Sequence, residues 1–449
     1  MNSLYSAPIL CLALAGCTSG PHHYRSSLSS WEQLCSDRAA LAAPDIEDFD
    51  ESAGLAELLS YARANSPAMG AAFQHWKGAL ELVPQVMALP NPRLTLGAYL
   101  SEVETRVGPM QGRVGLAQPF PWFGKLELAG DVAFEESEAA REMLEVVRLE
   151  LDERVRNTWY EYAWVEKAIR INEGNRDLLA HWERVARTRM ETGLGRHADV
   201  IRAQIELGKL EDRVQTLMDL RRPLAASLNA SLNRSAAASL PQPRFSQDEI
   251  QVIDGKWLSE SLTSSSPLLR AQDHRIRSAE HGIDLADKAF YPNFLVGADY
   301  TLIGSAENPA VSGSGDDALA LTLGFDLPIW RSSYEAGSRQ AEAKMRGSTL
   351  ERDELLNKLS AQLEMALYKF RDASRRVELF GGSLVPKGEQ SIQALNTGYQ
   401  SGNEGFLDLI DAQRVLLEFQ LQEARAMADR AKALATTERI TGIQLNQER

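Results

Sequence analysis

The stretch NPRLTLGAYL, residues 91–100, decides the fold because it alternates like a β-strand in a chain whose pattern is otherwise mostly helical. Leu94, Leu96, Ala98 and Leu100 fall on one side of a two-residue period, and Arg, Thr, Gly and Tyr occupy the other. A half-buried strand is therefore predicted here. The rest of the sequence has to explain what a strand does in a helical protein.

The strand occurs twice, because the chain repeats itself. Pro292 of YPNFLVGADYTLI follows Pro92 by 200 positions, and Ser266 of SPLLRAQ follows Ser66 of SPAMGAA by the same offset. Beyond the second strand of each copy the offset is 209, in the following pairs: Pro119 with Pro328, Gly193 with Gly402, Asp199 with Asp408 and Gln204 with Gln413. Two constant offsets predict a tandem duplication with a longer loop in the second copy.

Each copy continues into a long helical segment. Residues 126–190 contain no proline, and Ala, Glu, Arg and Leu dominate, so a helix of about 65 residues is predicted, on the order of 100 Å long. After a glycine turn, apolar residues recur at spacings of three and four from Ala203 to Leu228. We therefore expect a long antiparallel helical hairpin. A plain helical bundle shares this seam but does not need the length.

Four strand segments of about ten residues are expected, two in each copy, with a loop at residues 102–109 between the first pair. One face of each is apolar and the other is small or polar, which suits a tilted strand that crosses a bilayer. A soluble four-stranded sheet packed on a helix is the alternative. Four strands cannot close a barrel alone, so the membrane interpretation requires several chains that pool their strands, and three chains would give twelve.

The composition limits the function classes. The 449 residues include 62 acidic and 48 basic side chains, a formal charge of −14, which argues against nucleic acid or an anionic membrane surface as the main partner. No nucleophile elbow, Walker loop, dinucleotide-binding glycine motif or His-Glu-x-x-His motif occurs. We therefore expect no enzyme, no catalytic residues and no metal site, and treat His22 and His23 as solvated residues of a mobile lead-in.

The N-terminus contains a candidate targeting signal. A short apolar run ends in Leu-Ala-Gly-Cys at residues 14–17, which resembles a bacterial lipobox. In that interpretation residues 1–16 are a signal peptide and Cys17 carries two or three lipid chains, the only non-protein group expected. Thr18 after the cysteine favours the outer membrane. An ordinary signal peptide is the alternative, and Cys35 remains without a disulfide partner.

At this point the sequence resembles a known family, the TolC-like outer-membrane factors, also called outer membrane efflux proteins. The likeness covers the chain from about Leu55 to its end and is carried by four stretches: GLAQPFPWFGKLE (115–127), LGFDLPIW (323–330), TGLGRHADVIRAQIEL (192–207) and SGNEGFLDLIDAQRVLLE (401–418). The lipobox and the FPWFGK corner look most like the lipoprotein branch of CusC- and CzcC-type heavy-metal channels.

The resemblance implies a mixed α/β membrane protein with a tandem strand-strand-long-helix plan. Three chains would form a 12-stranded β-barrel in the outer membrane, four strands each, continued by an α-helical coiled-coil barrel through the periplasm. The segments expected along the chain are a signal peptide at 1–16, a lipidated segment at 17–54, one repeat at 55–235, a linker or equatorial segment at 236–260 and a second repeat at 261–449.

The implied function is that of a passive exit duct in a tripartite efflux system. Its partners would be two further copies, a periplasmic adaptor, an inner-membrane pump of the RND type and outer-membrane lipid. The branch likeness favours heavy-metal cations as cargo, with multidrug efflux or type I secretion as the alternatives. A periplasmic coiled-coil adaptor or structural lipoprotein is the alternative from another class, but it does not explain the strands.

The resemblance also implies site residues. Asp408 and Asp411 would line the periplasmic entrance, and six carboxylates from three chains would attract cations there. Asp199, which corresponds to Asp408 in the first copy, is expected at the entrance with them. From the residues alone, acids in a first helical turn, Asp199 among them, can equally stabilise the helix dipole. Tyr399 matches a tyrosine that holds the entrance shut, whereas Glu404 replaces an arginine of the family, so any closing bond through that position must differ here. Just beyond the strand ends, Trp122 and Trp330 suit an interfacial aromatic belt.

Overall fold

The computed structural model describes residues 22–41, 49, 53–243, 245, 253–308 and 310–445. Cys17 and the predicted signal peptide lie outside the described residues. The chain divides into two compact units, each assembled from three stretches of sequence. The first comprises residues 1–32, 74–141 and 271–353, and the second comprises residues 33–73, 142–270 and 354–449.

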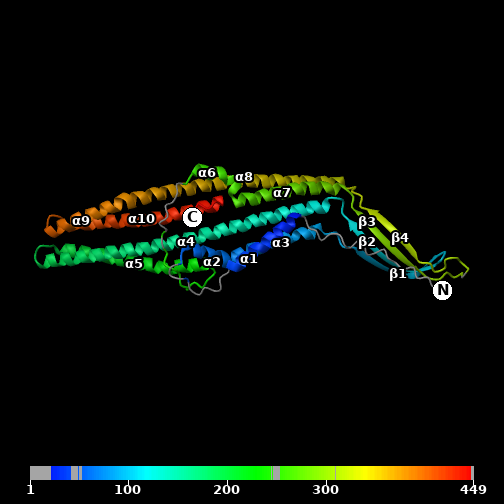
Figure 1. Cartoon of the computed structure of the whole chain (residues 1–449), viewed down its shortest axis with the longest axis horizontal. Coiled ribbons are helices and arrows are strands. Elements are labelled where there is room, and N and C mark those ends of the chain that lie inside the picture. The colour runs from blue at the N-terminus through cyan, green and yellow to red at the C-terminus, as the bar shows by residue number, and fades with distance from the viewer. Residues whose placement is uncertain are drawn as a thin grey trace. The chain divides into compact units, whose positions relative to one another are not determined.

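The duplication is visible in the order of elements (Figure 1). A short helix, a second helix, two strands and a long hairpin of helices occur in each half, and α2 and α6 are separated by the predicted 200 residues. The elements are α1 (His22–Leu41), α2 (Leu55–Asn65), α3 (Pro67–Met87), β1 (Arg93–Thr105), β2 (Gly108–Phe120), α4 (Lys125–Glu191), α5 (His197–Ser231), α6 (Gly255–Ser265), α7 (Pro267–Asp287), the 3₁₀ turn η1 (Lys288–Phe290), β3 (Phe294–Ile303), β4 (Ala318–Phe325), α8 (Arg331–Leu379), the π-helical turn η2 (Phe380–Leu384), α9 (Val385–Ser401) and α10 (Phe406–Thr441).

The first unit contains one antiparallel sheet in the order β1-β2-β3-β4, so the two copies meet at the β2–β3 pair. The predicted loop at residues 102–109 is wrong, because β1 and β2 run on to a tight turn. Gly108 allows this turn: its φ is +136°, and a Cβ there would lie 1.7 Å from the carbonyl oxygen of Gly304. At 13 residues each, β1 and β2 are longer than predicted, and in this extension the Gly304 amide donates to the carbonyl of Pro109 at 2.8 Å.

The two faces of the sheet differ as the alternation predicts. Leu96, Val114, Tyr300 and Leu319 are register neighbours across the four strands and are all at least 40% exposed. The other face is polar, where Asp299 binds Arg113 at 2.8 Å and Thr322 at 3.0 Å. The sheet therefore presents an apolar row on one face and a polar row on the other. Among the described residues, no helix combines the length and apolar character needed to cross a bilayer.

Helix α1 was not predicted, since its residues were expected to form a mobile lead-in. It is a regular helix of 20 residues, but its polar sequence gives only a weak apolar stripe. Two contacts with α3 help hold it: the ammonium of Lys77 lies 4.5 Å from the ring centroid of Trp31, and Tyr24 donates to Glu81 at 3.4 Å. The helix thus depends on tertiary contacts that local periodicity does not report.

The second unit contains the far ends of both helical hairpins, α4–α5 and α9–α10 (Figure 1). One apolar cluster joins all four helices, including the fully buried Trp182 and Phe406. The predicted α4 is confirmed at 67 residues without interruption. The second copy differs, because the turn η2, which contains Gly381 and Gly382, interrupts its long helix between α8 and α9.

Candidate functional site at the hairpin ends

Both hairpins turn through a glycine at the same place in their copies. Gly193 has a φ of +78° and Gly402 a φ of +83°, in the left-handed region that favours glycine. The amide of Asn403 donates to the carbonyl of Gly398 at 2.9 Å and closes the second turn. These turns place the predicted site residues of α5, α9 and α10 close to one another within the second unit.

Asp408 and Asp411 lie in the first two turns of α10, and both are exposed. The carboxylate of Asp408 lies close to Gly405, the residue just before α10: a Cβ added to Gly405 would lie 2.8 Å from this carboxylate. Asp411 accepts a bond from Arg414 at 3.0 Å and keeps 56% of its side chain exposed. Both acids are therefore free to face water or a second copy, and among the described residues only Asp411 forms an ion pair that offsets its charge.

Tyr399 is buried, in contrast to the two acids. Its ring centroid lies 5.3 Å from that of Phe406, and the side chain is only 5% exposed. Burial raises the pKa of the Tyr399 hydroxyl, and the negative charge of Asp199 acts in the same direction. Tyr399 is therefore a neutral packing residue at the end of α9.

Arg189 of α4 joins the first hairpin to the second. Its guanidinium donates to the carbonyl oxygens of Tyr399 at 2.5 Å and Gln400 at 3.2 Å, and it lies 4.9 Å from the Tyr399 ring centroid. These carbonyls belong to the last turn of α9, whose backbone acceptors lack helical partners. A cation at a helix C-terminus also complements the dipole of that helix. Arg189 therefore caps α9 from the neighbouring hairpin.

An ion pair also joins the two hairpins. Arg414 of α10 binds Glu206 of α5 at 2.7 Å, and Lys209 binds the same carboxylate at 2.8 Å. The hydrogen bond from Arg414 lowers the pKa of Glu206 below its ordinary value of 4.5. Glu206 thus stays ionised at neutral pH and holds two cations.

Asp199 is placed differently from the other predicted acids. It lies in the first turn of α5 with only 5% of its surface exposed, and its nearest cation is Arg196 at 3.6 Å. Its Oδ1 atom has no hydrogen-bond partner among the described residues. In the single chain Asp199 is therefore packed beneath the turn rather than displayed beside Asp408.

Glu404 is exposed in the turn between α9 and α10, and its amide donates to the carbonyl of Gly398 at 3.2 Å. A Cβ on Gly398 would lie 2.4 Å from the Cγ of Glu404, so the glycine makes room for this side chain. No ion pair of Glu404 is seen in the part of the chain that the structure describes. That any closing bond at this position differs from the one made by the family's arginine stays a prediction.

The two tryptophans predicted to form an interfacial belt lie at the strand ends. Trp122 follows β2 and stacks on Tyr291 at 5.4 Å, with 16° between the ring planes. Trp330 follows β4 and is 71% exposed. Their positions suit an interface between lipid and water, and that role stays a prediction.

The sequence did not identify Arg189, Arg414 or Glu206 as site residues. Each is a charged residue in a helical run, and its partner lies more than 200 residues away or on another helix. No local spacing marks such pairs. Within the described ranges, no group of three or more His, Cys, Asp or Glu side chains could hold a metal ion.

Comparison with known proteins gives a consistent result. The sequence model of the family described as "Outer membrane efflux protein" matches residues 58–234 and 258–443, one segment in each copy. The chain is 22% identical over 406 residues to the cobalt-zinc-cadmium resistance protein CzcC of Cupriavidus metallidurans, covering 86% of this chain and 90% of that protein. It is also 22% identical over 437 residues to the outer membrane protein OprJ of Pseudomonas aeruginosa, covering 91% and 89%.

Solved structures show the same fold. The outer membrane protein VceC of Vibrio cholerae superimposes with a TM-score of 0.71 at 19% identity and covers 87% of this chain and 97% of its own. CusC, described as a transmembrane channel, gives a TM-score of 0.71 at 14% identity, with 89% and 96% covered. The strand-strand-long-helix plan predicted from the sequence is therefore confirmed.

Proposed function

Because this chain belongs to the outer membrane efflux protein family, we propose that it is the exit duct of a tripartite efflux system, built from three copies of the chain. The family assignment makes it a channel protein and not an enzyme. It also rules out the periplasmic adaptor or structural lipoprotein that the helices alone would have allowed.

One observation carries the proposal, namely the open four-stranded sheet. In the described chain β1 and β4 each pair on one side only, so two strand edges are left without partners. Leu96, Leu100 and Leu321 on this sheet are 71%, 98% and 83% exposed. Exposed leucines are costly in water but favourable in lipid, whereas unpaired strand edges are not tolerated in lipid unless other strands complete the sheet. Three copies supply twelve strands, enough to close a barrel with an apolar exterior.

The exposed acids of α10 support the position of the entrance. In a threefold assembly Asp408 and Asp411 of each copy would contribute six carboxylates around one axis. Such a ring attracts cations and raises the proton affinity of its members. Asp199, buried in the single chain, would contribute to this ring only after the turn above it moves.

The partners follow from the passive character of the duct. A periplasmic adaptor would contact the hairpin ends, and an inner-membrane transporter of the RND type would supply the energy. Two or three lipid chains on Cys17 would anchor the N-terminus in the outer membrane, which one chain alone cannot do durably.

The similarity to CzcC supports heavy-metal cations as cargo. A multidrug or type I secretion duct is the second candidate, because the chain is similar to a comparable extent to OprJ, an outer membrane protein whose name mentions no metal. The two candidates differ in the compounds to which a strain without the protein becomes sensitive.

The test is growth inhibition of a clean deletion strain by divalent and monovalent metals, dyes, bile salts and antibiotics, with wild-type and Cys17→Ser complementation. We expect sensitivity to metal cations that the wild-type chain restores and Cys17→Ser restores less well. Sensitivity to amphiphilic drugs alone would move the duct to the multidrug class. An unchanged profile, together with no trimer on mild-detergent gels of the purified chain, would refute the efflux duct.

A further inference from the structure

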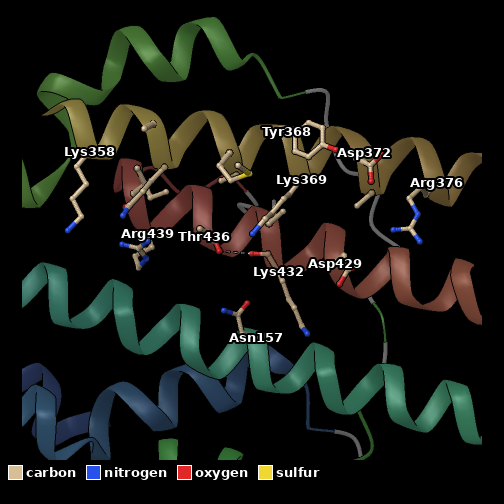
Figure 2. Close-up of a pocket in the computed structure, with 17 residues that line it drawn as sticks. Asn157, Lys358, Tyr368, Lys369, Asp372, Arg376, Asp429, Lys432, Thr436 and Arg439 are labelled. Atoms are coloured by element: carbon tan, nitrogen blue, oxygen red, sulfur yellow. Dashed lines mark hydrogen bonds between the residues drawn. The ribbon is translucent and has the colours of Figure 1, made fainter. Parts of the chain in front are cut away.

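A cavity in the second unit has no role in the proposed duct. It lies between α8 and α10, with α4 on its third side, and its volume is about 750 Å³ (Figure 2). That is the size of a pocket for one drug-sized molecule. All of its lining residues belong to the second unit.

The inner wall is mostly apolar. The apolar lining consists of small or aliphatic residues from both helices: Ala361, Ala366 and Ala373 of α8, and Ala433 and Ile440 of α10. Met365 and Tyr368 also line the cavity and are 54% and 58% exposed, so they lie at its mouth. Small side chains on two facing helices leave room between the helices. The wall can therefore cover the hydrocarbon or aromatic body of a ligand.

Three cations along α8 have no acidic partner in the part of the chain that the structure describes. Lys358, Lys369 and Arg376 are 11 and 7 residues apart, close to three and two helical turns, so they share one face. Figure 2 shows all three side chains extending from α8 toward the cavity. Arg376 donates only to the neutral amide of Gln422.

The acids of the lining do not offset these cations. Asp372 already binds Arg375 at 2.5 Å, and Asp429 binds Arg425 at 3.0 Å. Each is an ion pair within one helix, formed with a residue outside the lining. The cavity thus has a net excess of positive charge in a chain whose formal charge is −14.

The floor is held in place by charged contacts with α4. Lys432 contacts the carboxylate of Glu161, and Arg439 and Thr436 both bind Glu153, each at 2.6 Å. These residues fix the walls and are not available as free charges. The pocket is therefore rigid at its base and cationic along its α8 side.

One buried polar atom points to a ligand independently of the lysines. The Oδ1 atom of Asn157 has no hydrogen-bond partner in the described chain, although it is fully covered. Figure 2 shows Asn157 rising from α4 toward the cavity. A buried acceptor without a donor is costly, and a ligand hydroxyl or amine hydrogen would satisfy it once the Asn157 side chain turns its oxygen into the cavity.

We propose that this cavity binds amphipathic anions, with an acidic group held by Lys358, Lys369 or Arg376 and an apolar body against the alanine wall. A group with one N–H or O–H would also satisfy Asn157. This inference goes beyond the proposed function, because it assigns a ligand-binding site to the chain itself. Binding at that site needs neither the pump nor the adaptor.

The test uses two probes that differ by one charge. 8-Anilinonaphthalene-1-sulfonate carries an aromatic body, an N–H and a sulfonate, and N-phenyl-1-naphthylamine lacks the sulfonate. Both fluoresce more strongly in an apolar site. We titrate each into the purified full-length trimer in amphipol, and repeat the titration with Lys358→Gln/Lys369→Gln and with Lys387→Gln, an exposed lysine of α9, as the matched control.

The double variant is expected to bind the sulfonate about tenfold more weakly, as loss of a charged hydrogen bond predicts, and the neutral probe unchanged. The control should bind both probes as the wild type does. Equal sulfonate binding by the double variant would overturn the proposal, as would equal weakening of both probes. Disulfide formation between copies of a Lys369→Cys variant, without sulfonate binding by the wild type, would also overturn it, since a second copy would then fill the cavity.

Discussion

Replacing Arg189 with alanine tests whether the first hairpin holds the end of the second. The change removes the two bonds to the carbonyls of Tyr399 and Gln400 and the contact with the Tyr399 ring. Both bonds come from one guanidinium nitrogen and are counted together as about 1.5 kcal/mol, the contribution of a hydrogen bond from a charged donor, and a partly exposed cation–π contact adds about 0.5 kcal/mol. We therefore expect the end of α9 to open about 2 kcal/mol more easily, which is roughly a 30-fold change in the opening constant.

Hydrogen–deuterium exchange measures this opening directly. The amides of Gly402, Asn403 and Glu404 are bonded to carbonyls of the last turn of α9, at 3.1, 2.9 and 3.2 Å. Their exchange follows local opening when closing is fast. Exchange in a peptide spanning this turn should accelerate about 30-fold in the variant, while peptides from the centre of α4 keep their wild-type rates.

Two further variants test whether the effect is specific to the guanidinium of Arg189. Arg189→Lys keeps the positive charge but loses the planar guanidinium fork. Exchange of the turn peptide in this variant should therefore be faster than in the wild type and slower than in Arg189→Ala. Arg202→Ala removes an exposed arginine of α5 and should change nothing at the turn. An acceleration below threefold in Arg189→Ala, or an equal effect of Arg202→Ala, would refute the capping role of Arg189.

Three further predictions concern the same end of the hairpins. The pKa of Glu206 is lowered in the folded chain, so its stabilising bond with Arg414 is present above pH 4.5 and is lost as the pH falls through the lower folded pKa. Exchange of the amides around this bond should therefore accelerate in acid, and Glu206→Gln should abolish the acid dependence. Gly402→Ala should lower the free energy of unfolding by about 1 kcal/mol in denaturant titrations, and Gly402→Asn by less, because φ is +83°. Asp408→Asn with Asp411→Asn should reduce the cation preference of the reconstituted channel in planar bilayers, and an unchanged reversal potential would remove the acid ring from the proposal.

Much of the fold is predictable because it is periodic. The alternation from Leu94 to Leu100 predicts a strand with two unlike faces, and the run without proline predicts α4 to within a residue at each end. Helix α1 and the continuation of β1 to Thr105 are not predictable in the same way. Both depend on contacts with distant segments, namely those of Trp31 with Lys77 and of Pro109 with Gly304.

The candidate site was likewise predictable only in part. A motif resemblance pointed to Tyr399, Asp408 and Asp411, and the structure brings them to one hairpin end. Arg189 was missed because its acceptors are backbone carbonyls 210 and 211 residues away. Every residue type has a backbone carbonyl, so no residue type at the acceptor positions reveals the contact.

The break between α8 and α9 gives the two copies different mechanics. The long helix of the first copy runs 67 residues in one piece, so a push at its far end travels along a stiff column. The matching helix of the second copy contains the π-helical turn at Phe380–Leu384, where the regular ladder of hydrogen bonds is interrupted and bending costs least. The same plan has thus given one continuous helix and one interrupted helix, and we expect any bending at the hairpin ends to occur mainly in the second copy, which carries Tyr399.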